Sequence, residues 1–367
     1  CSKIKFRVML LWGGLAVAAA FVHAAEPLYE DQPRYFYRGL TYGSDAVFSP
    51  VGELINGALG ILQVSTNWET LDKIDLQNGL DITWRSITHP VKTVDSYGWR
   101  DFLLSEVVPG RFRWNNLQYI PNYHLHLIGG GARHRAFVEW YDAYDFPRPG
   151  AWAAATSILH AFLVEAVEHN DESQVTVDPV ADMLIFDPAG ALLFSSERVS
   201  RFFAQELNMS IWSSQPMYNP VSNSAENAGQ NYAFHYFFAE GQQVGVFQYW
   251  GMSDLLGLTV RNDEGFDWSV GVGGVVEELH EEGRGNGLSA FYARLKWDSG
   301  IFIHQNGSLL ASLQVSESWA QRFRLNIYPG LIQWHGLSPG IYLGVRDNDV
   351  VLGVNVMPIP VGLAVSQ

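Results

Sequence analysis

The second half of the chain, from about Tyr232 onward, alternates apolar and polar positions. Trp268, Val270 and Val272 are separated by serine or glycine, and the runs near the end of the chain keep the same rhythm. A period of two is typical of β-strands. Turn residues such as Asn306-Gly307 separate the runs. The pattern therefore predicts consecutive antiparallel strands joined by hairpins.

A long row of strands has two open edges, and closure into a barrel removes them. We predict a membrane β-barrel of roughly 10–12 antiparallel strands whose apolar face contacts lipid. A soluble periplasmic or extracellular barrel or sandwich, with its apolar face inside, is the alternative. Tryptophans clustered at strand ends resemble the aromatic girdles of membrane barrels: Trp250, Trp268, Trp297, Trp319 and Trp334.

The first half of the chain shows helical patterns. Ser49 and Pro50 are suited to begin a helix, and apolar residues then recur at three and four positions, so we expect an amphipathic helix over 50–64. Leu80, Ile82 and Trp84 alternate with polar residues and predict a strand. Residues 132–144 fit a helix or a strand equally well.

Two further stretches, 151–169 and about 179–207, predict a helical hairpin. Each is interrupted by acidic residues, so neither arm is suited to span lipid. We expect the hairpin to plug the barrel lumen or to cap its periplasmic mouth. The predicted fold is thus a membrane β-barrel with an α-helical N-terminal half.

The chain begins with the pattern of an export signal. Lys3, Lys5 and Arg7 precede an uncharged apolar run, and small residues follow it. We predict a signal peptide over 1–24, a helix-rich core with a few strands over 25–210, and barrel strands over 211–367. The last two form one structural unit.

Charge and cysteine content narrow the function. The chain has 38 acidic and 23 basic residues, a net charge of −15, which disfavours nucleic-acid binding. Charged residues make up only 17% while aromatics reach 14%, so we expect part of the outer surface not to face water. The single cysteine, Cys1, excludes a disulfide or a cysteine metal site within one chain.

The helical half also carries a resemblance. Residues 121–133, Pro121 to Arg133, resemble an uncharacterised family of bacterial outer-membrane barrel proteins, a domain of unknown function with a conserved helical hairpin. The likeness covers about 35–210 and includes Phe48-Ser49-Pro50, Glu165 to Glu168 and Ser195 to Arg198. It implies the outer membrane of a Gram-negative bacterium and brings no established chemistry.

Candidate chemistry lies in the same region. His124 and His126, two apart, would point to one side of a strand. Glu165, Glu168 and His169 share one face of the predicted helix. His160 precedes them, and Asp178 and Asp182 begin the second arm.

These residues have two interpretations. One is a site with His124, His126 and His169 as metal ligands, or with His124, His126, Glu165 and Glu168 as catalytic groups. The other is a structural network in which buried histidines and carboxylates pair with one another. We favour the network, so no cofactor is predicted, and a bound divalent metal ion is the alternative.

Other motifs are weaker. Ser173, Ser195 and Ser196 lack the strand-turn-helix elbow of a serine nucleophile. Gly129 to Arg133 lacks the Gly-Lys-Ser/Thr ending of a phosphate loop, so we interpret it as a tight turn that permits close backbone approach.

Two functional hypotheses follow. The first is a non-enzymatic outer-membrane barrel of structural, assembly or passage role, with a helix-filled lumen. The second is an outer-membrane enzyme acting on envelope lipid or lipopolysaccharide acyl chains. The first is favoured. The expected partners are outer-membrane lipid and other envelope proteins, with no nucleic acid.

Overall fold

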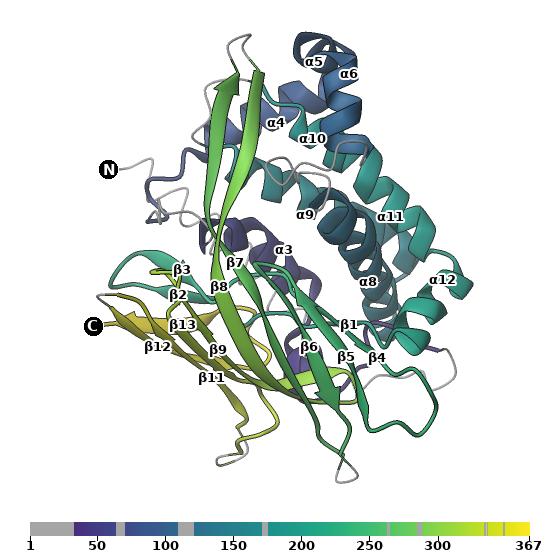
Figure 1. Ribbon diagram of the computed structural model, residues 1–367, viewed down its shortest axis with the longest axis vertical. Coiled ribbons are helices and arrows are strands. Elements are labelled where there is room, and N and C mark those ends of the chain that lie inside the picture. Colours follow the sequence, from purple (N-terminus) through teal and green to yellow (C-terminus); the bar gives the residue numbers. More distant parts are fainter. Residues whose placement is uncertain are drawn as a thin grey trace.

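A helical half precedes one large, mostly antiparallel sheet (Figure 1). The computed structural model describes residues 33–63, 70–108, 121–170, 175–262, 265–284, 288–333, 335, 337–347 and 349–367, with side chains except over 278–293. The predicted signal peptide, 1–24, lies outside the described residues.

Among the described residues the sheet has thirteen strands, more than the roughly 10–12 predicted, because three short strands precede Tyr232. From β4 to β13 each strand pairs antiparallel with the next one in the chain. The strands are β1 (Ser210–Ile211), β2 (Met217–Asn219), β3 (Ser224–Glu226), β4 (Tyr232–Tyr236), β5 (Val244–Trp250), β6 (Ser253–Val260), β7 (Asp267–Arg284), β8 (Leu288–Gln305), β9 (Ser308–Ser316), β10 (Phe323–Ile327), β11 (Pro339–Val345), β12 (Val350–Val356) and β13 (Gly362–Ser366).

The two ends of the sheet are formed by the short strands. The strand order begins β1-β4 and ends β13-β2-β3, and the sheet is not closed. β1 and β2 nevertheless belong to one stretch, 210–219. Its first part pairs with β4, and its last part pairs in parallel with β13. One segment of chain therefore contacts both ends of the long meander.

The alternating pattern places mainly apolar side chains outside, while the inside holds polar side chains together with buried aromatic and aliphatic ones such as Phe247 and Leu255. On β6, Leu256 and Leu258 are 59% and 57% exposed, whereas Thr259 is fully buried. The same holds on β7, where Val270 is exposed and Ser269 buried. The strand prediction is thus confirmed in its periodicity, and the sheet carries its polar side chains on the buried face.

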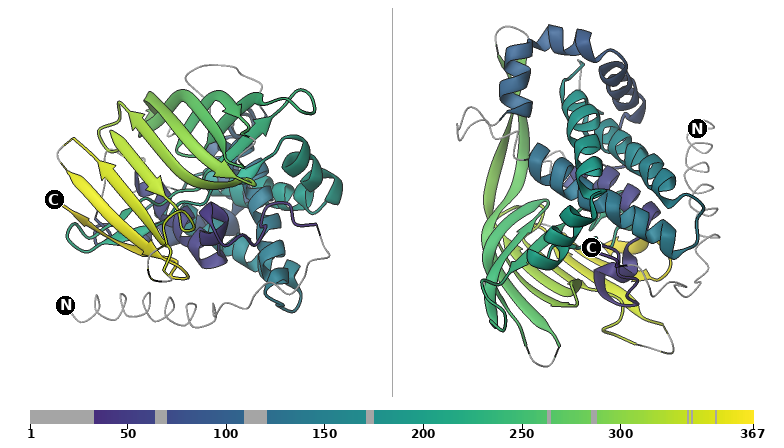
Figure 2. Two further views of the ribbon diagram at one scale, coloured as in Figure 1. Left: turned by 90° about the horizontal axis from the view of Figure 1, so that it is seen from below. Right: turned by 90° about the vertical axis from the view of Figure 1, so that its right-hand side faces the viewer.

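The helices gather beyond one end of the sheet, and the long β7–β8 hairpin extends alongside them (Figure 1). Seen from below, the sheet curves around the segment that holds α2 and α3 (Figure 2). Of the helical elements, η1 is a 3₁₀-helix and η2 to η5 are π-helices. They are α2 (Gly43–Val47), α3 (Pro50–Gly60), η1 (Ile61–Gln63), α4 (Leu76–Thr88), α5 (Pro90–Tyr97), α6 (Trp99–Phe102), η2 (Leu103–Val107), η3 (Asn122–Gly130), α8 (Gly131–Ala143), α9 (Pro149–Glu168), α10 (Asp178–Ala181), η4 (Asp182–Phe186), α11 (Asp187–Phe194), α12 (Glu197–Arg201) and η5 (Phe202–Glu206).

The amphipathic helix predicted at 50–64 is confirmed as α3 and η1 over the described residues, with the Ser49 side chain accepting from Gly52 N at 3.0 Å. The strand predicted at Leu80, Ile82 and Trp84 is wrong, because these residues lie within α4. Three alternating residues are too few to outweigh a helix that the Asp75 side chain caps.

The predicted hairpin is only partly correct. Its first arm is α9, one continuous helix, but the second arm is divided into α10, η4, α11, α12 and η5. The stretch 132–144 is helical, and this helix, α8, packs against both α9 and α11. This third helix thus lies against both arms, which also contact each other directly where α9 meets η4. By length and composition α9 is apolar enough to cross a membrane, although here it also packs against α3 and α4.

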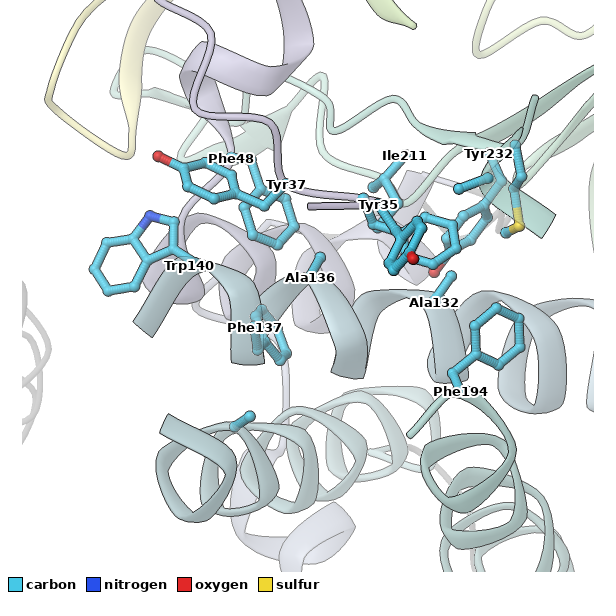
Figure 3. Close-up of a cluster of buried hydrophobic side chains, with 14 of the residues drawn as sticks. Tyr35, Tyr37, Phe48, Ala132, Ala136, Phe137, Trp140, Phe194, Ile211 and Tyr232 are labelled. Carbon is cyan, nitrogen blue, oxygen red and sulfur yellow. The ribbon is translucent and has the colours of Figure 1, made fainter. Parts of the chain in front are cut away.

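An aromatic core joins the helical half to the sheet (Figure 3). Phe137 on α8 is fully buried, and Tyr232 of β4 and Phe194 of α11 contribute to the same cluster. Glu139 of α8 accepts hydrogen bonds from three consecutive backbone N–H groups, those of residues 35–37, at 2.8 to 3.0 Å. This core holds α8 in place beside the sheet.

Candidate metal centre

Histidines and carboxylates from four helical segments, η3, α9, α10 and η4, meet in the helical half. Two groups of three residues each place one ligand atom per residue within 4.8 Å of the others. The first group is His126, Glu165 and Asp182, and the second is Glu165, His169 and Asp178. Glu165 belongs to both groups, so the two form one continuous centre.

The first group is built around His126 of η3. Its Nε2 lies 3.3 Å from Asp182 Oδ2, and its Nδ1 lies 3.2 Å from Asp187 Oδ1. In the tautomer that carries its proton on Nδ1, this N–H donates to Asp187. The lone pair of Nε2 then points toward Asp182 and the rest of the centre.

The second group lies at the C-terminal end of α9. Glu165 and His169 are four residues apart and so share a helix face, with His169 Nε2 3.2 Å from Glu165 Oε2. Asp178, at the start of α10, places Oδ2 3.8 Å from the same nitrogen. Glu165 and His169 are buried almost completely, at 1% and 0% exposure.

Close packing of backbones brings these segments together. A Cβ atom on Gly190 would lie 2.4 Å from the carbonyl oxygen of Leu127, and one on Gly131 would lie 2.7 Å from that of Gly190. Only glycine at both positions lets η3 and α8 approach α11 this closely. His126 and Asp182 both lie in π-helices, a wider helical form that is frequent at functional sites.

The centre is strongly acidic, and its carboxyl groups resist ionisation. Burial raises the pKa of Asp182 well above its usual value, and the charge of Asp178 adds to this effect. Burial also raises the pKa of Glu165. For the half-buried Glu168, burial and then Asp178 raise the pKa to about 8. None of Glu165, Asp182 and Asp187 forms an ion pair with a lysine or arginine within the part of the chain that the structure describes.

The pKa values of Glu106 and His126 are shifted by the same group of acids. Burial followed by the charge of Asp178 raises the pKa of Glu106 in η2 to about 8. For His126, burial would lower the pKa, but Asp187, Glu165 and Asp178 outweigh it and raise the pKa above its usual value. The surroundings therefore favour positive charge at the centre.

One oxygen of the centre has no partner. Asp182 is 4% exposed, and its Oδ1 is buried with no hydrogen-bond partner among the described residues. Buried polar atoms are almost always satisfied by protein, water or an ion. Asp182 Oδ1 is thus a buried acceptor without a donor among the described residues, whereas Oδ2 of the same side chain contacts His126.

Two of the donor pairs have the spacing expected for ligands of one metal ion. Two ligands each about 2 Å from a tetrahedral ion lie roughly 3.3 Å apart. The His126–Asp182 and His169–Glu165 distances, 3.3 and 3.2 Å, match this value. The contact from Asp187 to Nδ1 is the arrangement in which a carboxylate orients a metal-bound histidine. Nitrogen and carboxylate donors suit zinc, manganese and iron(II).

The structure brings together three of the five residues singled out as catalytic or metal-binding candidates. His126, Glu165 and His169 belong to the centre, and Glu168 lies beside it without being a member of either group. His124 does not join: its ring faces Trp250, with ring centroids 6.1 Å apart. The two histidines lie in η3 and not on a strand, and residues two apart on a helix point in different directions.

The remaining candidates lie elsewhere. His160 on α9 is buried against Gln230, and burial lowers its pKa well below the usual value, so it is neutral. Ser195 donates to the carbonyl of Leu192 at 2.7 Å, and Ser173 falls outside the described residues. The tight turn predicted at 129–133 is wrong, because this segment is continuous helix, although its glycines do permit close approach.

Asp187 and Glu106 were not among the predicted site residues. Asp187 lies in an Asp-Pro pair that reads as an ordinary helix start. Glu106 lies sixteen positions before Asn122, whose Nδ2 donates to its backbone carbonyl at 3.0 Å. Neither spacing signals a shared site along the sequence.

Comparisons with known proteins add no family to this picture. The chain matches none of the protein-family models, curated proteins or solved structures with which it was compared. The resemblance to an outer-membrane family stays a prediction.

Proposed function

We propose that this chain is an outer-membrane β-barrel protein with a helical half that caps one mouth, and that its role is structural, in assembly or in controlled passage. One observation carries the proposal: the exposed face of the sheet is mainly apolar, whereas the buried face holds serine, threonine, glutamine, aspartate and histidine side chains beside an aromatic cluster. Water favours the reverse arrangement.

The size of the exposed apolar face supports lipid contact. Exposed apolar side chains lie on many strands of the sheet and form an apolar band. In water, such a band would make the protein prone to aggregate. Its members include Val246, Leu256, Leu258, Val270, Val272, Leu295, Ile301, Val315, Leu352, Val354, Leu363 and Val365. Hydrocarbon is the solvent that such a band fits.

The stretch 210–219 supports closure. Because this segment pairs with β4 at one end and with β13 at the other, it bridges the gap between the first and last long strands. Gly362 N also donates to Pro216 O at 2.9 Å, beyond the ladder itself. A ring closed through this segment would leave no long unpaired edge in the bilayer, which a membrane protein requires.

The interior argues against a wide pore. Trp212, Phe247 and Phe302 are fully buried in one cluster inside the curved sheet. The segment with α2 enters the same space, where Gly43 N donates to Pro329 O at 2.7 Å and Asp45 N donates to Ser308 Oγ at 3.0 Å. A barrel filled in this way suits an anchoring or assembly role, or passage that requires movement of the helical half.

An arginine series along β6 tests lipid contact. Leu256→Arg, Leu258→Arg and Val260→Arg each place a charge on the exposed face at a different depth. In lipid vesicles we expect the free energy of unfolding in urea to fall by about 2–4 kcal/mol at the position closest to the midplane, and by about 0–1 kcal/mol near an interface.

The control for this series is Leu192→Arg, at an exposed position on α11 in the helical half, which should cost less than about 0.5 kcal/mol. If all three β6 variants were as stable as the control, and if the parent chain stayed monodisperse without detergent, the proposed function would be wrong.

A further inference from the structure

We propose that the candidate metal centre binds two divalent first-row transition ions per chain, bridged by the carboxylate of Glu165. His126 and Asp182 complete the first site, and His169 and Asp178 complete the second. This inference is independent of the membrane proposal, because every ligand lies in the helical half.

The bridging role follows from the shared residue. Both groups of donors include Glu165, and a carboxylate has two oxygens that can each bind one ion. In dinuclear protein sites the ions lie about 3.5–4 Å apart, within the reach of one bridging carboxylate. Glu165 is 1% exposed, so bulk water does not solvate its carboxylate, and a bound ion would balance the charge.

Charge balance favours two ions over one. Metal ions displace the protons of the ligand carboxyl groups, so the three ligands and Asp187 place up to four negative charges around two histidines. Two divalent ions supply four positive charges. A bound ion would also give the unpartnered Asp182 Oδ1 a partner.

The donor set selects the kind of ion. Each site offers one imidazole and two carboxylates, with no thiolate, which disfavours copper(I) and iron–sulfur clusters. Asp178, Asp187 and His126 are partly exposed, with side-chain exposures of 17%, 17% and 18%. The centre is therefore reachable by ions and water from this side and closed on the side of His169.

The test measures metal content directly. The mature chain is purified, stripped with chelator and loaded with Zn²⁺ or Mn²⁺, and bound metal is counted by mass spectrometry after dialysis. We expect two ions per chain, and with Mn²⁺ an exchange-coupled EPR spectrum. One ion, no ion, or a spectrum of isolated Mn²⁺ would overturn the proposal.

Variants assign the ligands. His126→Gln should leave one ion and Glu165→Gln fewer than one. The matched controls are His124→Gln and Glu53→Gln, the latter at a buried carboxyl of α3 outside both groups of donors, and both should keep two ions. Asp187→Asn should keep two ions but weaken affinity by roughly 10–100-fold, because it only orients His126. Circular dichroism of each variant separates loss of metal from loss of fold. Equal loss in the controls would contradict the assignment.

Discussion

The sheet interior and the candidate metal centre both bury charged side chains, but the sheet surrounds them with arginines and neutral partners, whereas Glu165, Asp182 and Asp187 in the centre pair with histidines and with no lysine or arginine among the described residues. On the sheet, Arg324 donates to Gln314 at 2.9 Å, and Asp298 accepts from Ser253 at 2.5 Å. Arg346 forms an ion pair with Glu226. In the centre, carboxylates face histidines and one another. The buried polar side chains of the sheet are thus satisfied by one another. The buried carboxyl groups of the centre have to bind protons or cations.

The largest expected difference between the two regions is in how the free energy of unfolding depends on pH. Glu106, whose pKa is raised by burial and by Asp178 of the centre, tests this difference. Its pKa is raised to about 8, so between about pH 5 and pH 8 the folded chain holds a proton that the unfolded chain has lost. Stability of the metal-free protein should therefore fall as pH rises through this window. We expect Glu106→Gln to reduce that fall by roughly 1 kcal/mol per pH unit.

The measurement is the free energy of unfolding in urea at several pH values, after chelation. Glu197→Gln serves as control, because the Glu197 side chain is 56% exposed. A Glu106→Gln protein with the same pH slope as the parent chain would show that Glu106 ionises normally in the folded state.

The second prediction breaks the balance inside the sheet. Arg324→Met removes the cation that faces Asp298 and leaves Gln314 Oε1 without its donor. We expect a loss of about 2 kcal/mol in the free energy of unfolding, since a buried polar group without its partner costs about 1–3 kcal/mol.

The comparison for this variant is Arg322→Met. Arg322 pairs with Asp347 on the surface, where their side chains are 44% and 43% exposed. Such an exposed pair contributes less than about 1 kcal/mol. Equal losses in the two variants would mean that the sheet interior is as well solvated as its surface.

Sequence patterns predicted the sheet better than the centre. Alternation repeated over many strands is a local signal, and it predicted which side chains share a face. The orientation of that face and the part played by 210–219 depend on tertiary pairing, which no local period encodes. A short alternation such as that at Leu80 misled, because a cap at Asp75 decides the local structure.

In the centre, helical spacing was sufficient to relate Glu165 to His169, which are four residues apart. It could not relate His126 to Asp187, which are 61 positions apart and meet because α11 packs closely on η3. The strand assumed for His124 and His126 paired the wrong residues. Sequence therefore predicted the ligand types and not the complete set.

The smallest expected effect is that of Asp182→Asn on the stability of the metal-free protein. We expect this variant of the centre to gain stability, whereas Arg324→Met in the sheet loses it. In metal-free protein near neutral pH, folding forces Asp182 either to take up a proton or to bury its charge beside other acids. Asparagine removes that cost, so we expect a gain on the order of 1 kcal/mol in the free energy of unfolding.

With excess Zn²⁺ the parent chain should gain more stability than the variant, because a ligand that binds only the folded state stabilises it. Urea titrations of both proteins, with chelator and with Zn²⁺, measure the two signs. If Asp182→Asn lowered stability in chelator as Arg324→Met does, the acids of the centre would already be balanced, as those of the sheet are.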